Sequence, residues 1–363
     1  SANTRLALAD WPGMAPVAGR ADGVAAWQLR WEQPGFVAMD RQTGGERRLT
    51  VRSSLEGIAL ALPAGLDKKA DALAPLRLEW SDTGAPQWRL DYDDRLRAVA
   101  GGARAALHFG DTPPSLPERP STRVSGALPV VDLTELAGAT GGQASTIGLP
   151  MPMRVDLALA GLDVSRWRVG EMNLAGWLRP DDWSLAATGA AQGMIQRPGP
   201  QAPWVLRLDR LDVQPRPAGA SPEATPDAPS GSAPPLPPAD IDLIAEQFHV
   251  AGERLGRLQL SQVNADAAAG RARLRLDGDW VDVDAQVDRT PDGATDSQLR
   301  FDLYTRDAGR LLAALGLPGA MERGDGTLSG NLRWQGAMLQ PAIPSLAGDL
   351  QIDLRNGSLP AIE

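Results

Sequence analysis

One pattern of strand-forming residues occurs twice in this chain, 86 residues apart. The first copy runs from Val155 to Leu174 and the second from Ile241 to Leu260, with the same offset at every matched position. Large apolar residues alternate with other residues in both copies, as in a strand with one buried face. The matched positions share Arg and Gly but no residue pair suited to catalysis. Such a unit predicts a building block of a long sheet rather than an active site.

The repeat continues beyond these two copies. Residues 274–278 resemble 185–189 at an offset of 89, which a three-residue loop insertion explains. Similar period-2 alternation predicts further strands, separated by clusters of Gly, Pro, Asp and Asn. These predicted strands are residues 26–31, 49–51, 58–62, 76–80, 88–92, 96–100, 104–109 and 122–126.

Helical signals are scarce. The clearest is 307–316, where Asp307 suits an N-cap and Gly316 a C′ position. A weaker one at 132–137 has capping-box spacing. The predicted fold class is therefore mostly β: an elongated, curled antiparallel sheet that forms an open hydrophobic groove, with one or two short helices.

The composition excludes several classes of function. Net charge is −9, and the 22% of charged residues mix both signs without a basic run, which argues against nucleic acid as a partner. The chain contains no Cys, which excludes a thiolate nucleophile, Cys-ligated zinc and disulfides. Hydrophobic residues make up 43%, but Ala accounts for much of this, and Phe plus Tyr total six, which favours a thin core.

Four segments follow from the shifts in composition. They are an N-terminal β-groove segment (1–150), repeat copy one (151–213), a Pro/Ala/Ser-rich linker predicted to be disordered (214–239), and repeat copy two with the helix near 307–316 (240–363). No signal peptide is evident, and no apolar run approaches the roughly 18 residues of a membrane span. We expect the sequence to be part of a longer protein.

The sequence offers little that resembles catalysis. His108 and His249 both lie in strand-like runs, and no nucleophile elbow, phosphate-binding loop or zinc-binding helix is present. We therefore predict that the protein is not an enzyme and uses no cofactor or metal. Three carboxylate clusters leave a glycosidase pair or a calcium site as alternatives to solvated strand faces and turns. They are Asp91/Asp93/Asp94, Asp181/Asp182 and Asp277/Asp279/Asp282/Asp284.

The apolar face of the predicted sheet needs a covering layer. Two short helices cannot cover so many strands, so the sheet either folds into a sandwich or curls into a trough. A trough would leave an apolar strip larger than a soluble monomer tolerates, and acyl chains suit it because each CH₂ removed from water contributes about 0.8 kcal/mol. Most of the eleven Trp are assigned to sheet packing, with groove lining as the alternative. The candidate lining residues are Val155, Leu157, Leu159, Val164, Met172, Leu174, Leu206, Leu208, Leu258, Leu260, Leu274, Leu276, Phe301 and Leu303.

Several segments, in their order along the chain, resemble the YhdP branch of the AsmA-like proteins of Gram-negative envelopes. They are 57–63 with Lys68 and Lys69, 124–132, the Arg-x-Gly units at 168–170 and 254–256, 307–316 with 324–336, and 348–359. The resemblance implies a periplasmic location, with an inner-membrane anchor supplied by a helix N-terminal to this sequence. It also implies a β-groove that guides phospholipids between the inner and outer membranes, with phospholipid acyl chains, the inner membrane and a contact with the outer membrane as partners. Residues 214–239 depart from the pattern expected of that family.

Two other functions remain open at this point. A closed β-sandwich array could act as a scaffold or interaction module of the envelope, in which case the purified protein would carry no lipid. A carbohydrate-active enzyme would use one of the Asp clusters, and Asn at positions 277 and 279 would abolish its activity.

Overall fold

The computed structural model describes most of the chain. The described residues are 2–6, 20–33, 46–62, 65–133, 152–216, 240–263, 270–289, 296–315, 317, 319–335 and 345–358. Of the described residues, 69% lie in strands and 3% in helix, in a curled, largely antiparallel sheet, which confirms the predicted fold class. The chain divides into two compact units, described separately below. Unit 1 comprises residues 1–131, 143–160 and 174–180, and unit 2 comprises 132–142, 161–173 and 181–363.

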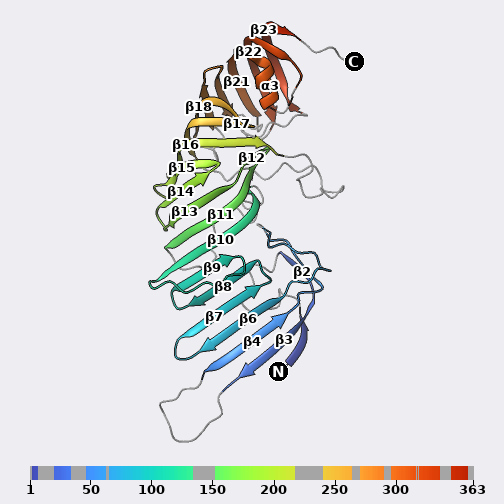
Figure 1. Cartoon of the computed structure of the whole chain (residues 1–363), viewed down its shortest axis with the longest axis vertical. Coiled ribbons are helices and arrows are strands. Elements are labelled where there is room, and N and C mark those ends of the chain that lie inside the picture. The colour runs from blue at the N-terminus through green and yellow to red at the C-terminus, as the bar shows by residue number, and fades with distance from the viewer. Residues whose placement is uncertain are drawn as a thin grey trace, which may run out of the picture. The chain divides into compact units, whose positions relative to one another are not determined.

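Unit 1 is built on neighbouring strands that follow one another in chain order, from dark blue to green in Figure 1. The strands are β1 (Ala2–Leu6), β2 (Ala21–Gly23), β3 (Ala25–Glu32), β4 (Arg47–Ser53), β5 (Ile58–Leu60), β6 (Leu76–Asp82), β7 (Pro86–Tyr92), β8 (Leu96–Gly101), β9 (Arg104–Phe109), β10 (Ser121–Asp132) and the first part of β11 (Met153–Val164). Antiparallel pairing joins β1, β3, β4, β6, β7, β8 and β9 in that order. Strands β2 and β5 pair with each other in a small separate sheet.

Unit 2 contains the remaining strands and helix α3 (Ala308–Ala314). Its strands are β12 (Trp167–Val169), β14 (Trp183–Gly189), β15 (Ala191–Arg197), β16 (Trp204–Pro215), β17 (Ile241–Val250), β18 (Glu253–Val263), β19 (Arg271–Asp277), β20 (Val281–Arg289), β21 (Asp296–Thr305), β22 (Glu322–Gln335) and β23 (Ala347–Ser358), while β13 (Met172–Leu178) has residues in both units. Strand pairing runs without a break from β14 to β23.

Strand β9 pairs with β10 in parallel, and β16 pairs with β17 in parallel. Parallel neighbours need a connection that returns to the same end of the sheet, whereas antiparallel neighbours need a tight turn. Residues 110–120 connect the first pair and 216–240 the second. The Pro-rich segment at 217–239, which lies outside the described residues, thus falls in a crossover connection. Residues 214 and 215 of the predicted linker end β16.

The two repeat copies share their turn conformation. Ser165 and Ala251, which are equivalent at the 86-residue offset, both have positive φ values, of 58° and 51°. Each follows the first strand of its copy, β11 or β17, and precedes the antiparallel partner, β12 or β18. The sequence repeat is therefore also a repeat of backbone geometry.

The Arg-x-Gly units lie after the strand turns rather than at them. The turns lie at Ser165 and Ala251, three residues before the arginines. Gly256 lies inside β18, where φ is +134° and an added Cβ would lie 2.1 Å from the Asp277 carbonyl oxygen. The register between β17 and β18 shifts beside it. Gly256 therefore permits a bulge at which the neighbouring backbone approaches closely.

Helix α3 begins where the sequence predicts. The Asp307 side chain accepts a hydrogen bond from the Arg310 backbone N–H at 2.9 Å, as an N-cap does. Gly316 and residues 134–137 of the weaker helix prediction lie outside the described residues. Helix α3 packs beside β22. Among the described residues, no helix has the length and apolar character needed to span a bilayer.

The core of unit 1 lies where residues 54–74 fold over one end of the sheet face. Leu55 and Ile58 from this segment pack with Trp27 and Val51 from the sheet. The Lys68 ammonium is buried there and donates hydrogen bonds to the carbonyl oxygens of Leu55 (2.8 Å), Ile58 (2.6 Å) and Lys69 (2.9 Å). Burial lowers the pKa of Lys68 below its ordinary value, because desolvation disfavours the ammonium. The three hydrogen bonds to carbonyl oxygens offset part of this cost.

Replacing Lys68 with Met should destabilise unit 1 by roughly 2–3 kcal/mol, because three carbonyls lose a charged donor. Urea denaturation followed by Trp fluorescence measures the loss. Lys69→Met is the matched control, since Lys69 is exposed, and it should leave the midpoint unchanged. Equal midpoints for the two variants would show that Lys68 does not hold the segment in place.

Candidate functional site

In unit 2, one face of the sheet carries two adjacent rows of apolar residues that cross every strand from β14 to β23. Members of a row are direct cross-strand partners, and the two rows lie two residues apart along each strand. The first row, called the open row below, is Leu185, Ile195, Leu206, Leu243, Leu260, Leu274, Ala285, Phe301, Gly330 and Leu350. The second, the buried row, is Ala187, Gly193, Leu208, Ala245, Leu258, Leu276, Val283, Leu303, Leu328 and Ile352.

From β14 to β19 the two rows differ in how exposed their side chains are. Ala187, Leu208, Ala245, Leu258 and Leu276 of the buried row are below 9% exposed. From β20 to β23 the buried row is exposed as well, since Val283, Leu303 and Leu328 are half-buried and Ile352 is 61% exposed. In the open row, the members from Leu185 to Phe301 are all partly exposed, and Leu350 on β23 is 56% exposed. Large apolar side chains that form a continuous row and remain partly in water are a candidate binding surface.

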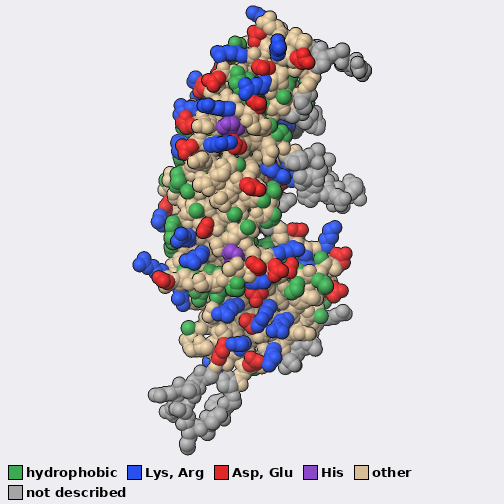
Figure 2. Space-filling model, viewed as in Figure 1, with side chains coloured by type: hydrophobic (Ala, Val, Ile, Leu, Met, Phe, Trp, Pro, Cys, Tyr) green, Lys and Arg blue, Asp and Glu red, His purple; other side chains and the backbone are tan. Residues whose placement is uncertain are grey.

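The polar face of the same strands explains why the apolar rows share one side. Residues between the row members point to the other face and carry charge, as Arg273 and Arg275 do on β19 and Asp282 and Asp284 do on β20. Arg271 and Asp288 pair across these strands at 2.8 Å. Figure 2 shows basic and acidic side chains interspersed on the visible surface. Strands β19 and β20 are thus amphipathic, whereas Ala186, Met194 and Ile244 occupy the corresponding opposite-face positions on β14, β15 and β17.

Gly330 is the open-row residue on β22. Side chains of the neighbouring strands occupy the space that a side chain at this position would take. A Cβ built on Gly330 would lie 2.6 Å from Leu350 Cδ2 and 2.9 Å from Phe301 Cε1. The apolar atoms of these two side chains therefore close the row over the glycine. Continuity of the row does not require a side chain at this position.

The structure brings eight of the predicted lining residues together on one face. Leu206, Leu260, Leu274 and Phe301 belong to the open row, and Leu208, Leu258, Leu276 and Leu303 to the buried row. Their role as a lining remains a prediction.

The other six predicted lining residues lie on β11 and β13. Val155, Leu157 and Leu159 alternate along the unit 1 part of β11, with Val155 and Leu159 buried. Val164 pairs with Trp167 in the β11–β12 hairpin. Met172 is buried at the start of β13, and Leu174 follows two residues later.

Unit 1 has an equivalent apolar face that the list of lining residues missed. Three adjacent rows cross its strands, by the registers from β3 to β10. They are Trp27, Ser53, Leu76, Tyr92, Leu96, Phe109 and Gly126; Leu29, Val51, Leu78, Leu90, Ala98, Leu107 and Val124; and Trp31, Leu49, Trp80, Trp88, Ala100, Ala105 and Thr122. The alternation in these strands was visible in the sequence, but the predicted lining residues were taken from other period-2 runs.

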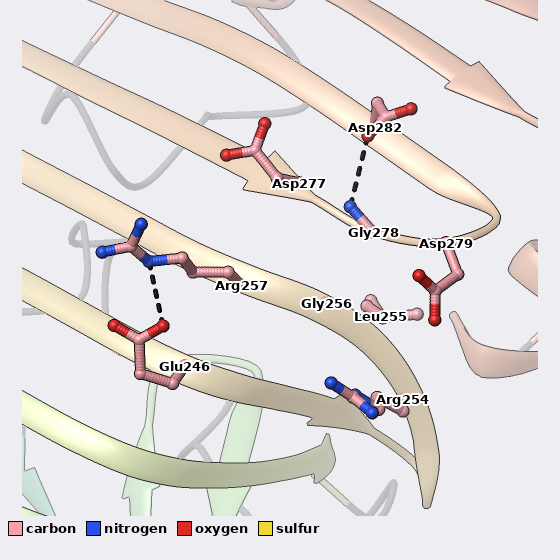
Figure 3. Close-up of a pocket in the computed structure, with 9 residues that line it drawn as sticks. All are labelled: Glu246, Arg254, Leu255, Gly256, Arg257, Asp277, Gly278, Asp279 and Asp282. Atoms are coloured by element: carbon pink, nitrogen blue, oxygen red, sulfur yellow. Dashed lines mark hydrogen bonds and ion pairs between the residues drawn. The ribbon is translucent and has the colours of Figure 1, made fainter.

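Three carboxylates of the predicted cluster, Asp277, Asp279 and Asp282, line a shallow cavity of about 310 Å³ on unit 2 (Figure 3). Asp277 pairs with Arg275 at 3.0 Å and is half exposed. Asp282 accepts a hydrogen bond from the Gly278 backbone N–H at 3.2 Å. These contacts are those of a strand surface and a turn, which favours the structural interpretation of this cluster.

Other candidate groups show similar structural roles. His108 Nδ1 lies 3.1 Å from Ser125 Oγ in unit 1, and His249 Nδ1 lies 3.0 Å from Asp212 Oδ1 in unit 2. Within the described ranges, His, Asp and Glu side chains form no group of three that could hold a metal ion.

Comparison with known proteins identifies the family. A family model described as "YhdP protein" matches residues 7–363, which confirms the resemblance noted in the sequence. Neither the comparison with curated proteins nor that with solved structures gave a match. Membership suggests a role in lipid transport or the cell envelope. Because the match covers nearly all of the sequence, the chain belongs to the YhdP family, which is a lipid-transport type of family rather than a known enzyme family.

Proposed function

We propose that the apolar face of the curled sheet holds phospholipid acyl chains and that the chain is a periplasmic part of a protein guiding lipid between the inner and outer membranes. The observation that carries the proposal is the open row, which crosses every strand from β14 to β23 while its side chains stay partly in water. An acyl chain laid across the strands would meet an apolar side chain, or Gly330 beneath two of them, at each strand.

The spacing of the row suits movement as well as binding. Neighbouring strands lie about 4.8 Å apart, so a lipid shifted by one strand meets nearly the same surface. Each CH₂ kept out of water contributes about 0.8 kcal/mol. Moving an acyl chain through water therefore requires a large free energy, whereas moving it along the row requires little. No nucleotide or catalytic group is needed on such a surface. The anchor in the inner membrane and the contact with the outer membrane belong to this proposal.

Native mass spectrometry of the purified chain tests the binding step. We expect mass additions of phospholipid that disappear after delipidation and return on incubation with phospholipid in mild detergent. Protein that stays lipid-free in both conditions would contradict the proposal and favour the scaffold function. A transport assay in cells lacking the full-length protein then tests the route between the membranes.

A further inference from the structure

The apolar face of unit 1 has one covered end and one open end. Trp27 and Trp31 lie on the same face of β3, four residues apart, yet Trp27 is 2% exposed and Trp31 is 51% exposed. Leu55 and Ile58, from the segment that Lys68 holds in place, pack at the Trp27 end. A ligand on this face therefore has its polar part at the Trp31 end, where the surface remains open to water.

Tryptophan dominates the row at the open end. Trp31, Trp80 and Trp88 belong to one cross-strand row. The Trp31 and Trp80 rings stack with centroids 5.9 Å apart, and those of Trp80 and Trp88 are 6.5 Å apart. Trp88 is 44% exposed. The indole ring combines an apolar body with an N–H donor, so it suits the boundary between hydrocarbon and polar groups.

The next position outward along the strands carries a pair of opposite charges. Arg47 and Asp82 are cross-strand partners on the same face as the tryptophans, with Arg47 Nη2 3.2 Å from Asp82 Oδ2. The Arg47 side chain is 55% exposed, and Asp82 also accepts a hydrogen bond from the Gly84 backbone N–H at 2.9 Å. Moving out from Val51, the face therefore presents aliphatic groups, then indoles, then one cation beside one anion.

We propose that the Trp31–Trp80–Trp88 row and the Arg47–Asp82 pair form a headgroup subsite for a phospholipid that bears a primary ammonium. This inference rests on the proposed function and adds a headgroup class to it. The order of surface chemistry matches that of such a lipid: acyl chains, ester region, then phosphate and ammonium. Arg47 contacts the phosphate, and the Asp82 carboxylate accepts hydrogen bonds from the ammonium. A headgroup without an ammonium leaves Asp82 facing the phosphate alone.

Competition between headgroups tests the subsite. The purified 363-residue chain is delipidated and incubated with equal amounts of phosphatidylethanolamine, phosphatidylcholine and phosphatidylglycerol of identical acyl composition, and bound lipid is quantified by mass spectrometry. We expect enrichment of phosphatidylethanolamine over phosphatidylglycerol by about threefold, the scale of one partly exposed charge pair.

Variants assign the selectivity to the subsite. Asp82→Asn should bring the ratio of the two lipids close to that of the mixture while total bound lipid stays the same. Arg47→Gln removes a contact with the phosphate that both lipids carry, so it should keep the enrichment of phosphatidylethanolamine. The amide introduced by Asp82→Asn retains an oxygen for the Gly84 N–H, so the turn is kept. Arg48→Gln is the matched control, because Arg48 pairs with Glu46 on the other face, and it should keep the wild-type ratio.

The possible outcomes separate this inference from the proposed function. Bound lipid with no headgroup enrichment, or enrichment that survives Asp82→Asn, would overturn the subsite and leave the acyl-chain function standing. Preferential binding of phosphatidylcholine would also overturn it, since that result would assign the selectivity to the indole rings rather than to the carboxylate. A chain that binds none of the three lipids would overturn the proposed function itself.

Discussion

Leu260→Asp should lower the amount of phospholipid bound to the purified chain at least about tenfold. Leu260 is in the open row, paired with Leu243 on one side and Leu274 on the other, so a carboxylate there would lie beneath the acyl chain. A charge desolvated by a lipid tail costs several kcal/mol, and about 1.4 kcal/mol already corresponds to a factor of ten. Because Leu260 is partly exposed without lipid, the fold itself should tolerate the change.

The matched control is the neighbouring residue on the same strand. Ser261 is exposed on the opposite face, next to Arg273, so Ser261→Asp adds the same charge one residue away without meeting the lipid. Native mass spectrometry should show wild-type lipid occupancy for Ser261→Asp. In the full-length protein, Ser261→Asp should keep lipid transport at the wild-type rate and Leu260→Asp should lower it. Equal lipid occupancy in the two variants would place the lipid somewhere other than the open row.

The structure also shows at which apolar residues a substitution tests lipid binding without destabilising the fold. Leu258 and Leu276 lie in the buried row, where a carboxylate would be desolvated in the protein itself. Their substitution would combine a loss of stability with any loss of binding. Leu260 and Leu274 separate the two effects, because the open row becomes fully dry only when lipid covers it.

Periodicity in the sequence was enough to predict most of this face. Alternation over residues 258–260 and 274–276 placed those leucines on one side of their strands, and the registers place them in common rows. Period-2 patterns work here because a sheet with one charged face fixes which side each residue occupies. The helix at 308–314 was also predictable, since Asp307 caps it locally.

Features that depend on contacts between distant parts of the chain could not be predicted from the sequence. The parallel pairing of β16 with β17 depends on where a crossover connection returns, although the length of the 214–239 segment was a usable signal. The row containing Trp31, Trp80 and Trp88 depends on the register between strands distant in sequence. The cover provided by residues 54–74 depends on tertiary packing, which alternation does not encode.

A cluster of buried charged residues in unit 2 could not be predicted from the sequence either. Asp163 stood out there only as one position of the repeat, equivalent to His249 in the second copy. In the structure it is 2% exposed, and Arg168 donates to both of its carboxylate oxygens, at 2.6 and 2.8 Å. Arg216 Nε lies 3.2 Å from Asp163, and Arg216 also pairs with Asp132 at 2.7 Å. The hydrogen bonds that Asp163 accepts raise the pKa of Arg168 above its ordinary value.

Asp163→Asn should destabilise unit 2 by about 3 kcal/mol, because it leaves the partly buried Arg168 without its charge partner. Hydrogen exchange measures the effect locally, and the amides of the β11–β12 hairpin should lose more protection than those of β19 and β20. Asp156→Asn is the control, since Asp156 is exposed on the same strand. Similar protection in both variants would mean that the ion pair contributes nothing to the hairpin.

A paired substitution separates the desolvation of these charges from the packing of the hairpin. When both partners of a buried ion pair become apolar, the cost of burying them disappears together with their attraction. Asp163→Leu combined with Arg168→Met should therefore be less destabilising than Asp163→Asn alone. Arg216 would retain Asp132 in that double variant. If the double variant instead lost more protection than the single one, the hairpin would depend on the hydrogen-bond geometry at Asp163 rather than on the balance of charge.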